Sequence, residues 1–371
     1  MKLQGKYDCI NSNRRGFLRN ISLGAAGLVI GQASWLSLSK PGAGEASAAQ
    51  ASPLAEPVEA RVSFSAGKDR RDLMVEILKP FEKEIRKGIK GKQVVIKPNC
   101  VWHDYPLCAT HPDAIRGVLD FLKPIYSQKV IIGESTASPN GTFYNFEKYG
   151  YTPLEKEYNA KLVDLNLDTA TTEWILGENR YPLDIRIIDA FLNPNNYIIS
   201  LARMKTHDCV VATLSMKNMI MASPINVPKN HPAFVKNQFE KAKMHQGGPK
   251  GINYNMFLVA HFARPKLAII DGVEGMEGNG PANGTPVEHG VAVAGLDAVA
   301  VDRIGLELMG IDYADVGYLQ WCSAAGLGQG DRSKIQIVGT ADLSKHVIKY
   351  KLRDNIAWQM EWKKDEKIVT K

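Results

Sequence analysis

The feature that most constrains the fold is an alternation of short apolar runs with amphipathic stretches along the chain. Residues 93–97 form a compact apolar run that Pro98 ends, and such a run is typical of a buried strand. Similar strand patterns occupy 129–133, 161–165, 266–270, 291–294 and 334–338, and helical spacing occupies 72–89, 112–125, 254–263, 297–309 and 314–325. Strands that alternate with helices favour a parallel sheet. We therefore expect an α/β fold with a mostly parallel sheet and flanking helices, either as one body or as two lobes around a cleft.

The middle of the chain is less regular. Residues 174–188 predict a hairpin that turns around Glu178-Asn179-Arg180, and residues 197–204 predict another strand. Pro, Asn, Gly and Lys crowd together between 222 and 251, which predicts a long loop with a single helix. Loops of this length in a compact domain are usually functional or mobile. We place the α/β domain at 72–345 and interpret residues 346–371 as a peripheral C-terminal extension.

An arginine pair near the start indicates an export leader. Arg14 and Arg15 precede a weakly apolar run at 21–38, and Ala46-Ser47-Ala48 fits a signal peptidase site. The alternative is an ordinary secretory core after a chance arginine pair. We expect residues 1–49 to be a twin-arginine signal peptide, read by the twin-arginine translocase and then cleaved, and residues 50–71 to be a linker and lead-in segment. The protein would then work in the periplasm or elsewhere outside the cytoplasm, without a stable membrane span.

Charge and cysteine content narrow the functional classes. Residues 1–49 hold six basic and two acidic side chains, so the formal net charge falls from +7 to +3 without them. This mild charge argues against a nucleic-acid partner, which would need a basic face. The spacing of the four remaining cysteines does not match an iron–sulfur cluster run. A disulfide between Cys100 and Cys108 is chemically allowed after export, but we expect free, buried cysteines.

Polar side chains follow the predicted strands wherever a strand ends. These strand ends read Lys97-Pro98-Asn99, Glu134-Ser135-Thr136, Lys205-Thr206-His207 and Asp271-Gly272. Ligands of open α/β sheets bind outside the carboxyl ends of the strands. We therefore expect Lys97, Asn99 and Lys205 to bind an anionic ligand such as a carboxylate or phosphate, with Glu134 and Asp271 as metal ligands or bases.

Three further segments belong to the predicted site. Thr110-His111-Pro112 begins a helix, and the free amides of such an end attract anions. Lys217-Asn218 places an ammonium beside an amide, a pair that can bind one oxyanion. Residues 271–281 form a glycine-rich turn with three carboxylates, whose Gly278 and Gly280 would allow close backbone approach to a ligand. The order of these glycines matches neither the P-loop nor the dinucleotide fingerprint.

Several of these residues have a purely structural alternative. A lysine at a strand end or a Thr-His pair is often a helix cap or a solvated group. His231 and His245 lie in the long loop and have no H-x-x-x-H spacing, so we interpret them as solvated or lid residues. Asp302 lies within a predicted helix and is expected to be an exposed helical charge.

Taken together, these motifs resemble the family known as domain of unknown function 362, from about residue 94 to 339. This resemblance implies an α/β domain that occurs alone or beside ferredoxin-like modules, often described as iron–sulfur-associated, although this chain has no ferredoxin cysteine run. The Lys-Thr-His and Lys-Asn succession is similar, more distantly, to the nickel-pincer lactate racemase superfamily. By that analogy His111, His207 and Lys217 would serve a bound cofactor.

We therefore expect an exported enzyme or cofactor protein of uncharacterised activity that binds a small anionic ligand at the strand ends, with a divalent metal as the candidate cofactor. The alternatives are a non-catalytic periplasmic binding or redox-accessory protein and an envelope interaction module. The expected catalytic residues are His111, His207, Lys205 and Lys217. The expected ligand-binding residues are Lys97, Asn99, Thr110, Thr206, Asn218, Gly278 and Gly280, and the expected metal ligands are Glu134, Asp271, Glu277 and His207.

Overall fold

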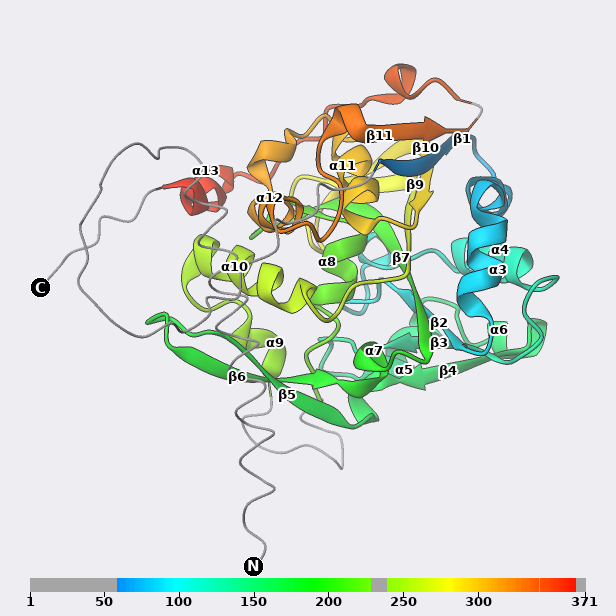
Figure 1. Cartoon of the computed structure of the whole chain (residues 1–371), viewed down its shortest axis with the longest axis horizontal. Helices are drawn as coiled ribbons and strands as arrows, with labels where there is room; N and C mark the ends of the chain where they lie inside the picture. The colour runs from blue at the N-terminus through cyan, green and yellow to red at the C-terminus, as the bar shows by residue number, and fades with distance from the viewer. Residues whose placement is uncertain (1–58, 228–238, 340, 365–371) are drawn as a thin grey trace, which may run out of the picture.

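A computed structural model describes residues 59–227, 239–339 and 341–364, and its centre is a nine-stranded sheet flanked by helices (Figure 1). Eight strands follow one another across the sheet, and β8 (Ala212–Thr213) pairs with β7 beside this path. Their order is β11 (Ile335–Val338), β1 (Ala60–Ala66), β10 (Thr285–Gly295), β9 (Leu267–Glu277), β7 (Asn196–Thr206), β2 (Gln93–Pro98), β3 (Val130–Glu134) and β4 (Ala160–Asp164). The prediction of a mostly parallel α/β sheet is confirmed.

Parallel pairing joins the five strands β9, β7, β2, β3 and β4 into one block. Because neighbouring strands in this block run the same way, their carboxyl ends lie along one edge of the sheet. Antiparallel pairs join β9 to β10 and β10 to β1, while β1 and β11 are parallel. The block therefore has the geometry in which open α/β sheets bind ligands.

Helices cover both faces of the sheet. One face packs against α2 (Arg70–Leu78), α3 (Glu82–Ile89) and α4 (Pro112–Leu122), and the other against α8 (Ser215–Ile220), α10 (Gly248–Ala260), α11 (Ala298–Leu308) and α12 (Gly317–Ala324). Short helices occupy the connections: α5 (Thr142–Lys148), α6 (Leu154–Glu157), α7 (Asp189–Leu192), α9 (Glu240–Lys243) and α13 (Ile356–Gln359). The predicted hairpin at 174–188 is present as β5 (Ala170–Leu176) and β6 (Pro182–Ile188).

Two hydrophobic cores explain why the strands are apolar almost without interruption. Ile198 of β7 belongs to the core under α8 and α10, whereas the next residue, Ile199, belongs to the core under α2 and α4. Successive side chains of a strand point to opposite faces, so a strand covered on both faces needs apolar residues at consecutive positions. This requirement produces the compact runs seen in the sequence.

The structure differs from the sequence-based expectation at three places. Residues 60–66, which the sequence places in the lead-in segment, form β1 and pair with β10 and β11. The predicted helix 72–89 is interrupted at 79–81, where Pro80 removes a backbone donor. The predicted glycine-rich turn begins later than expected, because β9 continues through Asp271 to Glu277 and pairs with β10.

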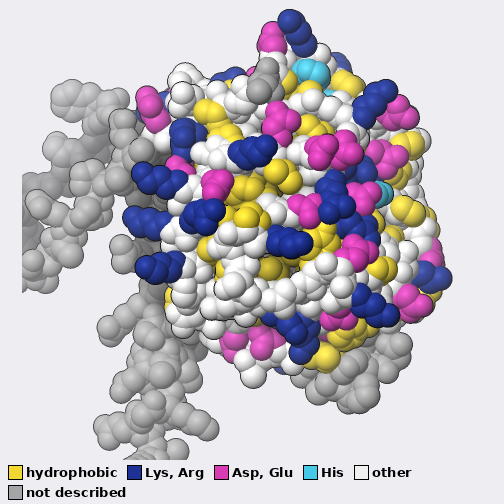
Figure 2. Space-filling view, turned by 90° about the vertical axis from the view of Figure 1, so that its right-hand side faces the viewer, with side chains coloured by type: hydrophobic (Ala, Val, Ile, Leu, Met, Phe, Trp, Pro, Cys, Tyr) yellow, Lys and Arg dark blue, Asp and Glu magenta, His cyan; other side chains and the backbone are white. Residues whose placement is uncertain are grey.

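Surface charge is mixed on the side of the molecule that carries α3, α4 and α6. Basic and acidic side chains alternate over most of this face (Figure 2). Within the described residues, no helix is long and apolar enough to cross a membrane. The predicted signal peptide at 1–49, residues 50–58 of the linker and His231 lie outside the described residues.

Candidate active site

A cavity of about 400 Å³ opens at the carboxyl ends of β2, β3 and β7, beside α8. It brings together seven residues that the sequence singled out from four separate segments. These residues are Lys97, Asn99, Glu134, Lys205, His207, Lys217 and Asn218. Other lining residues include Cys100, Thr213, Lys241 and His245. The predicted convergence of polar strand ends therefore occurs for these residues.

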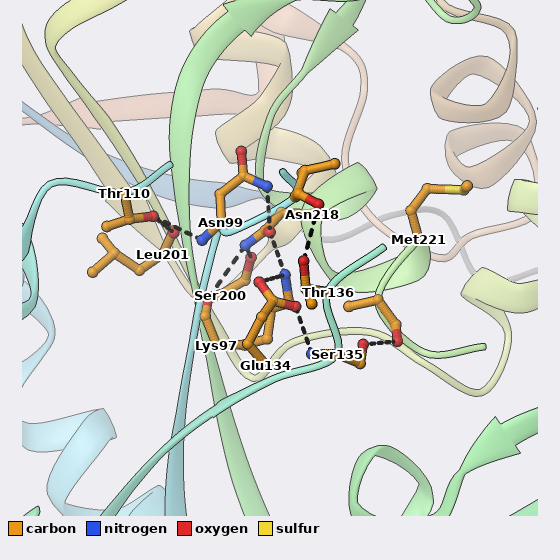
Figure 3. Close-up of polar contacts among 12 residues, drawn as sticks. Lys97, Asn99, Thr110, Glu134, Ser135, Thr136, Ser200, Leu201, Asn218 and Met221 are labelled. Carbon is orange, nitrogen blue, oxygen red and sulfur yellow. Dashed lines mark hydrogen bonds and ion pairs between the residues drawn. The ribbon is translucent and has the colours of Figure 1, made fainter. Parts of the chain in front are cut away.

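Lys97, Glu134 and Asn218 form a buried network at the floor of the cavity (Figure 3). Lys97 Nζ donates to Glu134 Oε2 at 2.9 Å and to Asn218 Oδ1 at 2.6 Å. Asn218 Nδ2 donates to the Lys97 carbonyl at 3.2 Å and to Ser200 Oγ at 3.0 Å. Burial lowers the pKa of Lys97, and the Glu134 carboxylate opposes this effect. The Lys97 ammonium group is thus already paired within the protein.

Asn99 has one buried polar atom without a partner. Its Nδ2 donates to Asn218 Oδ1 at 3.2 Å. The orientation of the Asn99 amide is fixed because Lys97 Nζ also donates to Asn218 Oδ1, so that atom must be the oxygen and can only accept. Asn99 Oδ1 then has no hydrogen-bond partner among the described residues, and neither does Thr213 Oγ1. Both residues line the cavity. Because unsatisfied buried polar atoms are costly, these two atoms indicate contacts that a ligand would supply.

Two further lysines face the cavity, on β7 and α8. Lys205 Nζ donates to the Pro281 carbonyl at 2.9 Å, and no carboxylate within the described ranges pairs with Lys205 or Lys217. Burial lowers the pKa of Lys205 to about 8, and neighbouring Arg203 and Lys97 add to the effect. Burial lowers the pKa of Lys217 to about 7, and Lys205 adds to that effect. The cavity thus holds two titratable amines close to neutral pH.

The loop after β7 is held by the C-terminal segment that the sequence placed at the periphery. Gln359 Nε2 donates to the His207 carbonyl at 3.0 Å, and Gln359 Oε1 accepts the Val211 amide at 2.6 Å. Asn355 donates to the Asp208 carbonyl at 2.8 Å, and Arg353 pairs with the Asp208 carboxylate at 3.4 Å. The extension therefore reaches the cavity wall and sets the position of His207.

His207 is neutral in this setting. Burial lowers its pKa well below the usual value, and the ammonium groups of Lys217 and Lys205 act in the same direction. Its Nδ1 accepts the Cys209 amide at 3.1 Å. The imidazole is thus positioned as a neutral group that can accept or pass a proton.

His207, Asp208 and Cys209 could hold a metal ion, since one ligand atom of each lies within 4.8 Å of the others. Among the described residues they are the group that meets this criterion, and they differ from the predicted set. Glu134 is paired with Lys97, Asp271 with Arg70, and Glu277 accepts the Lys351 amide. The structure therefore does not bring Glu134, Asp271, Glu277 and His207 together.

Asp271 and His111 lie apart from the cavity lining. Asp271 is fully buried in β9 and pairs with Arg70 at 2.9 Å. His111 is the N-cap of α4, where its Nδ1 accepts the Asp113 amide at 3.2 Å, and Arg70 is among its charged neighbours. Neither residue lines the cavity with His207 and Lys217.

The remaining predicted ligand-binding residues contact the segments that form the cavity. Thr110 Oγ1 accepts the Asn99 amide and donates to the Leu201 carbonyl, both at 2.7 Å. Thr206 Oγ1 donates to the Gly278 carbonyl at 3.1 Å. A Cβ at Gly280 would come within 2.0 Å of the Thr206 carbonyl oxygen, so glycine permits this close approach. None of these four residues contributes to the cavity lining.

The expectation that Asp302 is an exposed helical charge is wrong. Asp302 is fully buried in α11 and accepts the backbone amides of Ser215 at 2.8 Å and Met216 at 2.9 Å. Burial raises its pKa to about 8, while the two amides act in the opposite direction. Asp302 thereby caps α8, the helix that carries Lys217 and Asn218. The sequence held only a weak signal, an acidic residue within an apolar helix.

Lys241 is a cavity residue that the sequence analysis missed. Its Nζ donates to Ser135 Oγ at 3.1 Å and to the carbonyls of Met221, Ala222 and Pro224 at 2.8–3.0 Å. These bonds tie α9 to the end of β3 and to the segment after α8. Burial lowers the pKa of Lys241 to about 7. No sequence motif marked this lysine, because three of its four acceptors are backbone carbonyls of a distant segment.

The cysteines of the described ranges are free, as expected. Cys100, Cys108 and Cys322 are buried, and Cys209 is half-buried. Burial raises the pKa of Cys209 to about 12, and the Asp208 carboxylate contributes. Cys209 is therefore a thiol at neutral pH unless a cation displaces its proton.

Comparisons with known proteins give a family, one distant relative and one solved structure of weak similarity. The model of a family described as "Domain of unknown function (DUF362)" matches residues 94–307, more than half of the chain. A thylakoid-associated protein of Synechocystis sp. is 27% identical over 233 residues, which cover 61% of this chain and 65% of that protein. The match thus spans just under two thirds of this relative. A protein of Thermotoga maritima with a crystal structure is 11% identical, with a TM-score of 0.34, over 71% of this chain and 60% of that one.

Replacing Asp302 with alanine is expected to destabilise the protein by about 2–5 kcal/mol, because the buried amides of Ser215 and Met216 would lose their acceptor. Asp302→Asn keeps one acceptor oxygen and is expected to cost less. Urea unfolding of the wild type and both variants measures the difference. A loss below about 1 kcal/mol for Asp302→Ala would contradict the proposed cap of α8.

Proposed function

The chain belongs to the family described as domain of unknown function 362, and we propose that its cavity binds a small anionic ligand, a carboxylate or a phosphate. One observation carries the proposal. Lys205 and Lys217 both face the cavity, and no described carboxylate pairs with either of them. Buried cations in proteins are normally paired. An anion that enters the cavity would provide the missing partner.

The other lining groups suit the same ligand. The Thr213 hydroxyl has no partner among the described residues and can donate to an anion, while the free Asn99 Oδ1 can accept from a ligand hydroxyl or amine. We assign anion binding to Lys205 and Thr213, and proton transfer to Lys217 and neutral His207. These roles describe an enzyme. A binding or redox-accessory protein would use the lysines for affinity alone.

A divalent metal at His207, Asp208 and Cys209 is the second candidate. Imidazole, carboxylate and thiolate are donors that Zn²⁺ accepts, and the three groups lie close together. Metal binding would have to displace the proton of the Cys209 thiol. In the structure Cys209 Sγ donates this proton to Asp208 Oδ1, with 3.2 Å between the two atoms. The nearby ammonium groups of Lys205 and Lys217 oppose a cation. For this reason we place anion binding first.

We also propose that the protein is exported, on the strength of Arg14, Arg15 and the run after them. Replacing both arginines with lysine keeps the charge but removes the pair that the twin-arginine translocase reads. We expect the double variant to remain in the cytoplasm, as measured by cell fractionation and immunoblotting. The matched control is Arg19→Lys, which leaves the pair intact. Equal export of all three proteins would remove the twin-arginine proposal.

Oxalate and phosphate are suitable probes for the anion site. Isothermal titration should show binding of at least one of them to the wild type, and Lys205→Met should weaken it roughly 10- to 100-fold, the value of a charged hydrogen bond. Lys161→Met is the control, because Lys161 is exposed on β4 and does not line the cavity.

The same titration separates the two candidates. Binding that survives a chelator and depends on Lys205 supports the anion site. If a chelator abolishes binding, Zn²⁺ restores it and Cys209→Ala prevents the restoration, the metal candidate is correct. Failure of both anions to bind the wild type would overturn the proposal.

Oxalate affinity is expected to fall as the pH rises from 6 to 9. Oxalate keeps its charge over this range, whereas Lys217 and Lys205 lose protons near pH 7 and 8 in the free protein. A bound anion favours the ammonium form, so binding takes up protons, and each lysine can reduce the affinity by up to about tenfold per pH unit. The charged neighbours of the pair are Lys97, Arg203 and Asp208. Titrations in two buffers of different ionisation enthalpy measure the proton uptake, and a flat profile would contradict these roles.

A further inference from the structure

We propose that Lys217 forms an imine with a small carbonyl compound that also carries a carboxylate, such as a 2-oxo acid. This proposal rests on the proposed function, because Lys205 would hold the carboxylate of the same ligand. It goes further in naming a reactive group on the ligand, and it replaces proton transfer by Lys217 with a covalent step while His207 keeps the proton-transfer role. Four lysines surround the same cavity and differ in their hydrogen-bond partners.

Three of the four cavity lysines have defined acceptors. Lys97 donates to Glu134 and Asn218, Lys205 to the Pro281 carbonyl, and Lys241 to Ser135 Oγ and three carbonyls. Lys217 Nζ makes no hydrogen bond and no ion pair within the described part of the chain, although Lys217 lines the cavity. Of these four amines, Lys217 is therefore the one available for chemistry.

The surroundings of Lys217 favour the neutral amine, which is the form that attacks a carbonyl. Lys217 is only 7% exposed, so its ammonium form loses most of its hydration. The ammonium group of Lys205 is its leading charged neighbour, and it disfavours a second charge nearby. Desolvation and a neighbouring cation are two ways in which enzymes activate a lysine nucleophile.

The step balances without any further reactant. Lys217 Nζ adds to the carbonyl carbon, the C–O double bond becomes a single bond, and the oxygen takes up a proton to give a carbinolamine. The first proton on the oxygen comes from the attacking nitrogen. The hydroxyl then takes the second proton of the nitrogen and leaves as water, while the nitrogen lone pair forms the C=N bond. Neutral His207 can carry the proton between these stages. Asn99 Oδ1, which has no partner among the described residues, can accept from the carbinolamine hydroxyl.

Reductive trapping tests the imine directly. The full-length protein is incubated with pyruvate and sodium cyanoborohydride, and the reduced adduct is located by peptide mass spectrometry. We expect the adduct on Lys217, little of it on the exposed Lys161, and its loss in Lys217→Arg. That variant keeps the positive charge but has no amine able to form an imine, and circular dichroism checks its fold.

Oxalate has no ketone or aldehyde carbonyl and reports the anion site alone. An adduct on Lys217 that excess oxalate prevents supports the inference. If wild-type protein binds oxalate but gives no adduct, or labels its exposed lysines equally, the imine is refuted while the anion site stands. If neither oxalate nor phosphate binds and no adduct forms, both proposals fail. The trapping of the wild type decides the matter even if Lys217→Arg does not fold.

Discussion

The buried contact between Lys97, Glu134 and Asn218 is the interaction on which the rest of the site depends. It joins β2, β3 and α8 through side chains that are each at most 3% exposed. Because Lys97 is only a donor, it forces the orientation of the Asn218 amide, and that amide in turn fixes Asn99. Breaking one partner of such a buried pair leaves an uncompensated charge and costs more than the pair contributes. Lys97 thus determines which atoms Asn218 and Asn99 present to the cavity. Its own ammonium group is already paired with Glu134 and Asn218.

The sequence predicted the sheet well because its strands are covered on both faces. That coverage requires unbroken apolar runs such as 93–97, and the polar residues after them mark the carboxyl ends. Lys97, Glu134 and Lys205 were found in this way, whereas Lys217 was found as part of a Lys-Asn pair. The same rule failed for Asp271, because β9 does not end there but continues as a long hairpin with β10. His111 begins a helix, as predicted, yet capping α4 does not bring it to the cavity.

Other site residues could not be predicted from local sequence, because their partners are remote. Asp302 caps a helix that lies 86 positions earlier in the chain, and Lys241 donates to backbone carbonyls that carry no sequence signature. Gln359 contacts the His207 loop across 152 positions. Spacing rules describe neighbours on one element. They do not predict which distant backbone groups a side chain will form hydrogen bonds with. In the sequence, each of these residues therefore resembled an ordinary surface or helix position.

The C-terminal segment fixes the loop at residues 207–211 through Arg353, Asn355 and Gln359, and this dependence affects the dynamics of the site. Contacts that join such distant positions form late and slowly during folding, because a long loop must first close. The segment that makes them is short, and much of it lies at the surface. Segments of this kind open more readily than the central strands. When this segment detaches, the loop that carries His207 loses the hydrogen bonds that position it, and one wall of the cavity opens. The arrangement of the reactive groups therefore depends on how well the C-terminal segment stays bound.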